Sequence, residues 1–190
     1  MKELTATFQS EVFRPVVTLV IPGFYGLSTS SIALWQRAPG LHHYVNDFPG
    51  LAATIMLLAV LTLGLLAEEV GAQIEAYFDR ELAKKKGYEN HREEWFKYLR
   101  LAFDKEPVGH RYLRTLVLRL KFELGMTVAS IPFAIGVLFI QISITCRIAI
   151  FAVSASLAAY LAFEAQQSDE KLSELRREML KKDWESTTRA

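Results

Sequence analysis

Four long apolar stretches constrain this chain of 190 residues more than any other feature. They run over about 16–35, 48–67, 124–143 and 148–165. The first two hold 20 uncharged residues each, which as α-helix extend about 30 Å, the thickness of the hydrocarbon core of a bilayer. The last is the shortest and needs Arg147 to extend outward at its start. The sequence therefore predicts an all-α, polytopic membrane protein with four transmembrane helices.

The distribution of positive charge predicts how these spans are oriented. Of the 22 Lys and Arg residues, two precede the first stretch, twelve lie between Arg80 and Lys121, and six lie at or after Lys171. Only Arg37 and Arg147 occupy the two short connections. Because cytoplasmic segments carry the excess of Lys and Arg, we expect a multi-pass protein of the cell (inner) membrane with both termini and the central segment in the cytoplasm.

The polar segments are expected to continue the spans as helices. We predict a helical insert over 68–123, with an amphipathic helix at 88–104, and a C-terminal helix over 166–185. Each piece is too small to bury a core alone, so the pieces should pack together as one cytoplasmic helical layer within a single domain. Leu172, Leu175 and Met179 suit a bundle contact. The segments 88–104 and 168–184 are also the candidate docking sites for a soluble protein partner.

The first span is unusually polar and contains a helix breaker. Pro22 and Gly23 predict a kink near the middle of the bilayer. A hydroxyl-rich face could line a hydrated pore, or the small residues could allow close packing while the hydroxyls bond to the backbone at the kink. The connection 36–47 is expected to be an outer loop, and 143–147 a tight outer turn. The pore-lining candidates are Thr18, Tyr25, Ser28 and Thr29.

Acidic and basic residues gather where the second and third spans enter the polar region. Carboxylates share one face of the helix that continues the second span, with one further carboxylate beside them, and they can pair with cations of the antiparallel third helix. A carboxylate and a cation within the third helix can also pair with each other. Such a network is either a salt-bridge layer joining the two helices, or a divalent-metal site or ion relay. Its members are Glu68, Glu69, Glu75, Asp79, Arg111, Arg114, Arg119, Lys121 and Glu123.

One segment of this network is similar to a known family. The segment 67–80, AEEVGAQIEAYFDR, resembles the signature segment of prokaryotic diacylglycerol kinase. The resemblance implies that Glu68 corresponds to the catalytic carboxylate of the family and Glu75 to its metal-binding one, with MgATP phosphorylating a lipid alcohol. The chain departs from the family at Gly71, where the family has asparagine, and in its four spans instead of three. We interpret the match, which covers 14 of 190 residues, as convergence on an amphipathic helix end.

Several classes of function are excluded or left open by these observations. Cys146 is the only cysteine, which excludes an internal disulfide, and no motif for nucleic acid binding is present. We expect a homo-oligomer in the lipid bilayer that forms a pore or channel-like assembly or perturbs the membrane, as a stress or immune effector gated through its cytoplasmic helices. The alternatives are an intramembrane lipid-modifying enzyme, which alone would need a divalent cation as cofactor, and an adaptor for a soluble partner.

Overall fold

The computed structural model describes residues 14–84, 91–99 and 108–188, and that part of the chain is helical apart from short connections. The all-α class is thus confirmed, and four of the helices in this part of the chain are long and apolar enough to cross a membrane, one for each predicted span. The elements in chain order are the π-helix η1 (Val16–Val20), α2 (Ile21–Arg37), α3 (Pro39–Asp47), α4 (Pro49–Ala83), α5 (His91–Leu99), α6 (Val108–Phe139) and α7 (Ile144–Thr188).

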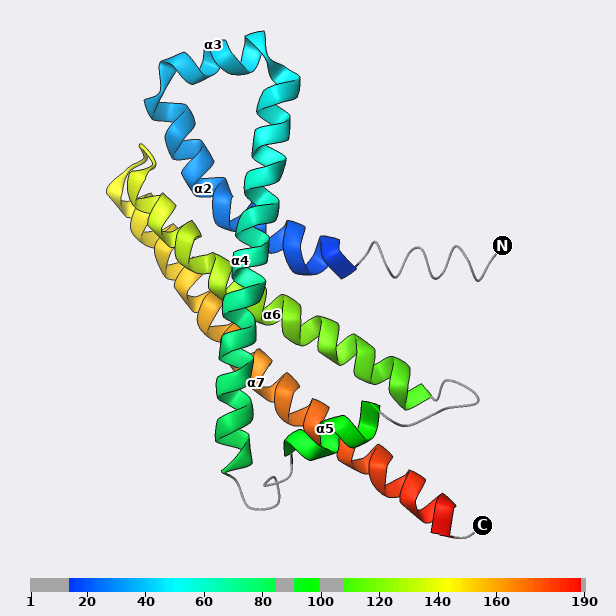
Figure 1. The fold of residues 1–190 in the computed structure, drawn as a ribbon. Coiled ribbons are helices and arrows are strands. Elements are labelled where there is room, and N and C mark those ends of the chain that lie inside the picture. Colours follow the sequence, from blue (N-terminus) through cyan, green and yellow to red (C-terminus); the bar gives the residue numbers. More distant parts are fainter. Residues whose placement is uncertain (1–13, 85–90, 100–107, 189–190) are drawn as a thin grey trace.

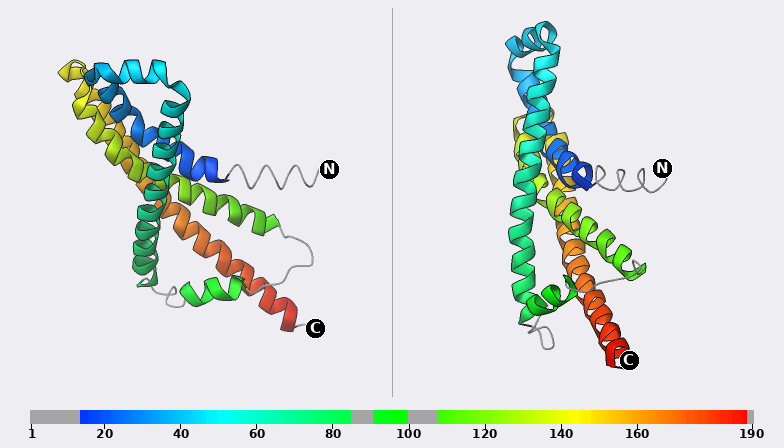
Figure 2. Two further views of the ribbon diagram at one scale, coloured as in Figure 1. Left: turned by 45° about the horizontal axis from the view of Figure 1, so that its top comes forward. Right: turned by 45° about the vertical axis from the view of Figure 1, so that its right-hand side comes forward.

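Helix α6 lies at the centre of the arrangement. In its most apolar stretch 39% of the residues are buried, against 17% for α4 and 11% for α7. α6 and α7 form a long antiparallel hairpin, and α2 packs along α6 (Figure 1). α4 crosses this group and then diverges from α6 and α7, while α5 packs against α7 (Figure 2). We call the polar parts beyond the apolar stretches, namely 68–83, 108–123 and 164–188 with α5, the charged end.

The irregularity predicted at Pro22 occurs just before it, as a π-helix. Pro22 has no backbone N–H, so the carbonyl of Thr18 loses its usual helical partner. Over Val16–Val20 the chain adopts π-helical geometry, and the N–H of Ile21 donates to the carbonyl of Val16. The Thr18 hydroxyl also donates to the carbonyl of Arg14 at 3.1 Å. Helical hydrogen bonding thus continues through the break with a changed pattern.

Glycines bring α2 and α4 into direct backbone contact. A Cβ added at Gly23 would lie 2.0 Å from the carbonyl oxygen of Val60, and one at Gly64 would lie 2.2 Å from that of Leu19. Such approach is possible only without side chains at these two positions, as in many membrane helix pairs. The Pro-Gly pair of the first span therefore sets the distance between the first two spans.

Both connections on the far side from the charged end differ from the expectation. The segment 36–47, expected as a loop, contains the helix α3, which has Pro39 in its first turn and so suits a helix start. The turn between α6 and α7 lies at 140–143 and not at 143–147, because the Ser143 hydroxyl accepts from the N–H of Cys146 at 3.3 Å and begins α7. The third span accordingly ends at Phe139, four residues early.

We predict that Gly23→Ala destabilises the protein by about 1–3 kcal/mol, because the added methyl group overlaps the α4 backbone. The measurement is the free energy of unfolding in mixed micelles of SDS and a mild detergent. Gly40→Ala is the matched control, since nothing lies within 4 Å of a Cβ there. Equal stability of the two variants would contradict the close contact between α2 and α4.

Candidate functional site

The hydroxyl groups proposed as pore-lining are engaged within the chain. Thr29 is buried, and its hydroxyl donates to the carbonyl of Phe133 in α6 at 2.7 Å. The hydroxyl oxygens of Tyr25 and Ser154 are 3.2 Å apart, and the Ser28 hydroxyl donates to the carbonyl of Tyr25 at 2.7 Å. Together with buried Thr18, these groups bond one helix to another or to its own backbone.

Two of these residues still border the molecular surface. Tyr25 and Ser28 are half-buried and line a surface hollow of about 420 Å³ on the outside of α2. The rest of its lining is apolar, with Phe24 and Met126 among the residues. Of the four candidates, only Tyr25 and Ser28 can therefore meet another molecule directly.

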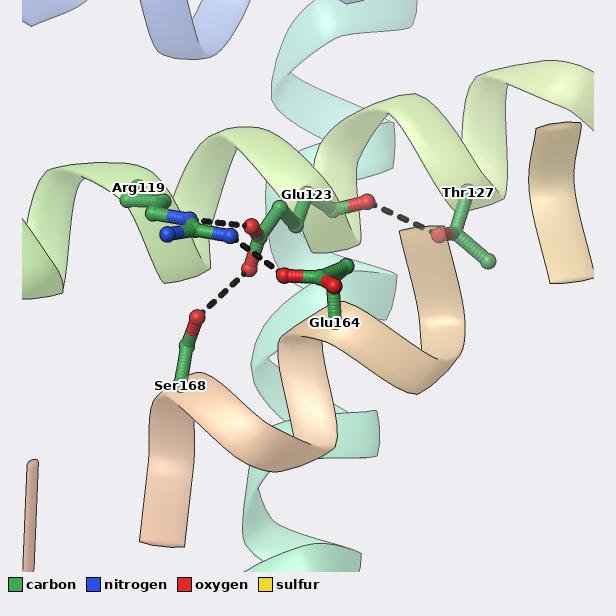
Figure 3. Close-up of polar contacts among 5 residues, drawn as sticks. All are labelled: Arg119, Glu123, Thr127, Glu164 and Ser168. Atoms are coloured by element: carbon green, nitrogen blue, oxygen red, sulfur yellow. Dashed lines mark hydrogen bonds and ion pairs between the residues drawn. The ribbon is translucent and has the colours of Figure 1, made fainter. Parts of the chain in front are cut away.

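A buried carboxylate joins α6 to α7 at the start of the charged end. Glu123 is 4% exposed and accepts from Arg119 Nε at 2.6 Å and from the Ser168 hydroxyl at 2.9 Å, one bond to each carboxylate oxygen (Figure 3). Arg119 also pairs with Glu164 of α7 (Figure 3). A buried carboxylate with both oxygens bonded avoids most of the cost of burying a charge. This group, Arg119, Glu123, Glu164 and Ser168, is called the α6–α7 clasp below.

A second bridge joins α4 to α6. Lys121 Nζ lies 2.6 Å from Glu75 Oε2, and the two side chains are 21% and 26% exposed. On the same helix as Glu75, Glu68 and Asp79 are half-buried and Glu69 is exposed. Among the predicted cations, Arg114 is exposed, whereas the side chain of Arg111 lies outside the described residues. The α4 carboxylate face therefore meets α6 through Glu75 and Lys121.

The charged end contains contacts that sequence reasoning missed. The guanidinium carbon of Arg176 lies 5.0 Å from the centre of the Trp95 ring, and Arg177 Nε is 3.4 Å from Glu94 Oε1. These contacts join α5 to α7 across some 80 residues of sequence. The adjacent Arg176 and Arg177 and the amphipathic pattern of α5 were visible in the sequence, but their pairing required the fold.

An apolar core supports these polar contacts. Residues of α5, α6 and α7 form it, and the α7 positions expected to make a bundle contact belong to it or pack against it. Those positions are therefore engaged within the chain itself. The core contains Tyr98, Leu113, Leu116, Leu120, Leu124, Ala165 and Leu172, with Ile74, Phe78, Trp95, Val117, Leu175, Met179 and Leu180 packed against it.

The space between the diverging helices of the charged end is a pocket of about 660 Å³. All four elements of the charged end contribute to it, and it holds both members of the bridge between α4 and α6. Its lining is Glu75, Ala76, Asp79, Arg80 and Ala83 of α4, Trp95 and Phe96 of α5, Val117 and Lys121 of α6, and Asp169, Leu172 and Arg176 of α7.

The carboxylates of this region are arranged around cations of the chain. Over the described residues, no group of three or more His, Cys, Asp or Glu side chains is placed to hold a metal ion. Glu75, which the resemblance to diacylglycerol kinase would make a metal ligand, is bonded to Lys121 instead. An exposed ion pair lies at the end of α4, where Lys84 Nζ is 2.5 Å from Glu81 Oε1. The hydrogen bond and the charge of Glu81 raise the pKa of Lys84.

Comparison with known proteins returns no relative: no family model, no curated protein and no solved structure matches the chain.

We predict that Glu123→Gln destabilises the protein by about 1–3 kcal/mol, because the amide cannot replace two hydrogen bonds to a buried, charged acceptor. The free energy of unfolding in mixed micelles measures this effect. Glu81→Gln removes the same charge from an exposed pair, and it should change stability by less than about 0.5 kcal/mol. If the two losses are equal, the α6–α7 clasp does not hold the hairpin together.

Proposed function

We propose that the protein is an oligomeric membrane protein whose assembled spans conduct ions or breach the bilayer, and that the charged end controls this activity. In this proposal the charged end and both termini face the cytoplasm, as the distribution of Lys and Arg favours. The protein then acts as a stress or immune effector of the cell membrane.

The observation that carries the proposal is the continuity of three helices. α4, α6 and α7 hold 35, 32 and 45 residues without interruption, or about 52, 48 and 68 Å at 1.5 Å per residue. Each is much longer than the roughly 30 Å of a hydrocarbon core. A displacement imposed on the charged end can therefore pass along continuous helices into the apolar spans, and Pro132 marks the point at which α6 can bend.

The conduction path in this proposal lies between copies of the chain. Within one copy the hydroxyls of the first span are bonded internally. The apolar stretches of α4 and α7 are mostly unburied, at 17% and 11%, and offer large surfaces to lipid or to further copies. Tyr25 and Ser28 supply polar groups at the surface of α2, where a second copy could bring them to a shared path.

We predict that the purified protein in liposomes releases an encapsulated small dye and carries current across planar bilayers. Ser28→Trp should reduce both by at least about tenfold, because a large side chain at the surface of α2 obstructs a path between copies. Ser28→Thr is the matched control, since it keeps the hydroxyl and adds only one methyl group, and it should retain most of the activity.

The oligomeric state is measured on the same samples by light scattering in detergent. Wild type and Ser28→Trp should both elute as assemblies, so that lost release reflects obstruction and not dissociation. A monomeric wild-type protein that retains the dye would contradict the proposal and would favour the adaptor alternative.

A further inference from the structure

The pocket of the charged end has the size and the wall chemistry of a small-molecule site. Its volume of about 660 Å³ lies within the roughly 300–1,000 Å³ of typical ligand pockets. Helix α4 diverges from α6 and α7 in this region (Figure 1), and residues of α5 line the pocket together with residues of those three helices. A ligand in this position would contact every helix of the charged end.

One wall of the pocket is apolar and aromatic. Trp95 and Phe96 of α5, together with Val117 and Leu172, supply this surface. Trp95 is fixed by the guanidinium of Arg176 on its face, a cation–π contact. Phe96 is 50% exposed, so its ring is accessible to a ligand body. This wall fits a small aliphatic or aromatic group.

The charges around the pocket are balanced. Three carboxylates line it, those of Glu75, Asp79 and Asp169, together with three cations, Arg80, Lys121 and Arg176. The most informative are Glu75 and Lys121, because they bond to each other from α4 to α6 at the pocket wall, at 2.6 Å, and are each about three-quarters buried. Any ligand that enters between them breaks the ion pair and contacts both charged groups.

This pair discriminates between classes of ligand. An anion that takes Lys121 leaves the Glu75 carboxylate poorly solvated without its partner, and a cation that takes Glu75 leaves Lys121 in the same condition. Separating a largely buried pair in this way is costly. A molecule that carries an ammonium and an anionic group satisfies both, and it replaces one ion pair by two.

We propose that this pocket binds a small zwitterion, with its ammonium on Glu75, its carboxylate or phosphate on Lys121, and its apolar body against the α5 wall. Free amino acids and the ethanolamine phosphate headgroup of a phospholipid share this chemistry. This binding proposal does not depend on the proposed conduction, because binding is measured from the unfolding temperature of the protein and not from the flux of ions or dye.

The test measures the unfolding temperature of the full chain in phospholipid-free detergent. The soluble probes are L-phenylalanine, L-leucine and O-phosphoethanolamine, with 3-phenylpropanoate and 2-phenylethylamine as analogues of phenylalanine that lack one charge. At least one zwitterion should raise the unfolding temperature with an apparent Kd at least tenfold lower than that of either analogue. Stabilisation by phosphatidylethanolamine but not phosphatidylglycerol, with no effect of the soluble probes, would identify the lipid headgroup as the source.

Two results overturn the proposal. One is the absence of stabilisation by every soluble zwitterion and by phosphatidylethanolamine. The other is equal binding of a zwitterion and its single-charge analogues, which would reveal an apolar site only.

Variants locate the binding to the pair. Glu75→Gln and Lys121→Met should each weaken zwitterion binding at least tenfold. The double reversal Glu75→Lys with Lys121→Glu keeps the ion pair and should retain binding, because the ligand can turn end for end. Glu81→Gln, in an exposed pair outside the pocket lining, should bind as wild type does. Wild-type affinity in both single variants would exclude this pocket.

Discussion

The backbone contact between α2 and α4 is the constraint on which the other helix positions depend. Gly23 lies against Val60 and Gly64 against Leu19 so closely that no side chain fits. One further glycine, Gly71, brings α4 to α6, where an added Cβ would lie 3.2 Å from that of Leu124. Beyond Gly71, α4 contains no further glycine and diverges from α6 (Figure 2), although Ile74 and Phe78 still pack against the core. The glycine positions therefore determine both where the spans are tight and where the pocket begins.

Beyond the glycine contacts, polar contacts and the apolar core of the charged end hold the helices together. Around α6, Arg119 connects to α7 through Glu164, and two residues later Lys121 connects to α4 through Glu75. The two connections differ in environment. The α6–α7 clasp surrounds a buried carboxylate and includes a neutral hydroxyl, whereas the bridge to α4 borders open space. The polar contacts between α6 and α7 are thus more extensive and more buried than the bridge to α4, and the pocket lies beside that bridge.

The sequence predicted the elements better than their contacts. Uncharged runs of 20 residues and continuous periodicity into the polar regions were sufficient for the spans and their extensions, because both depend on local composition. The clasp partners Glu164 and Ser168 and the stacking of Arg176 on Trp95 were not predicted, since each joins residues distant in sequence. The sequence misplaces the turn between α6 and α7, because Ser143 suits the start of a turn as well as the cap that its hydroxyl forms on α7. Such pairings depend on which helices the fold brings side by side, and a single sequence does not contain that information.

The π-helix before Pro22 changes how the first span should be mapped onto its surroundings. A turn with i to i+5 bonding holds more residues than an α-turn, so five residues of it accumulate an offset of roughly 90–100° about the helix axis. A helical wheel with uniform steps therefore misplaces the residues before the π-helix relative to those after Ile21. In this chain Thr18 bonds to its own helix at Arg14, while Thr29 bonds to α6. On both sides of Ile21 the first span nevertheless faces the same neighbours, because Leu19 and Gly23 lie against α4, while Thr18 and Pro22 lie against Gly125 of α6.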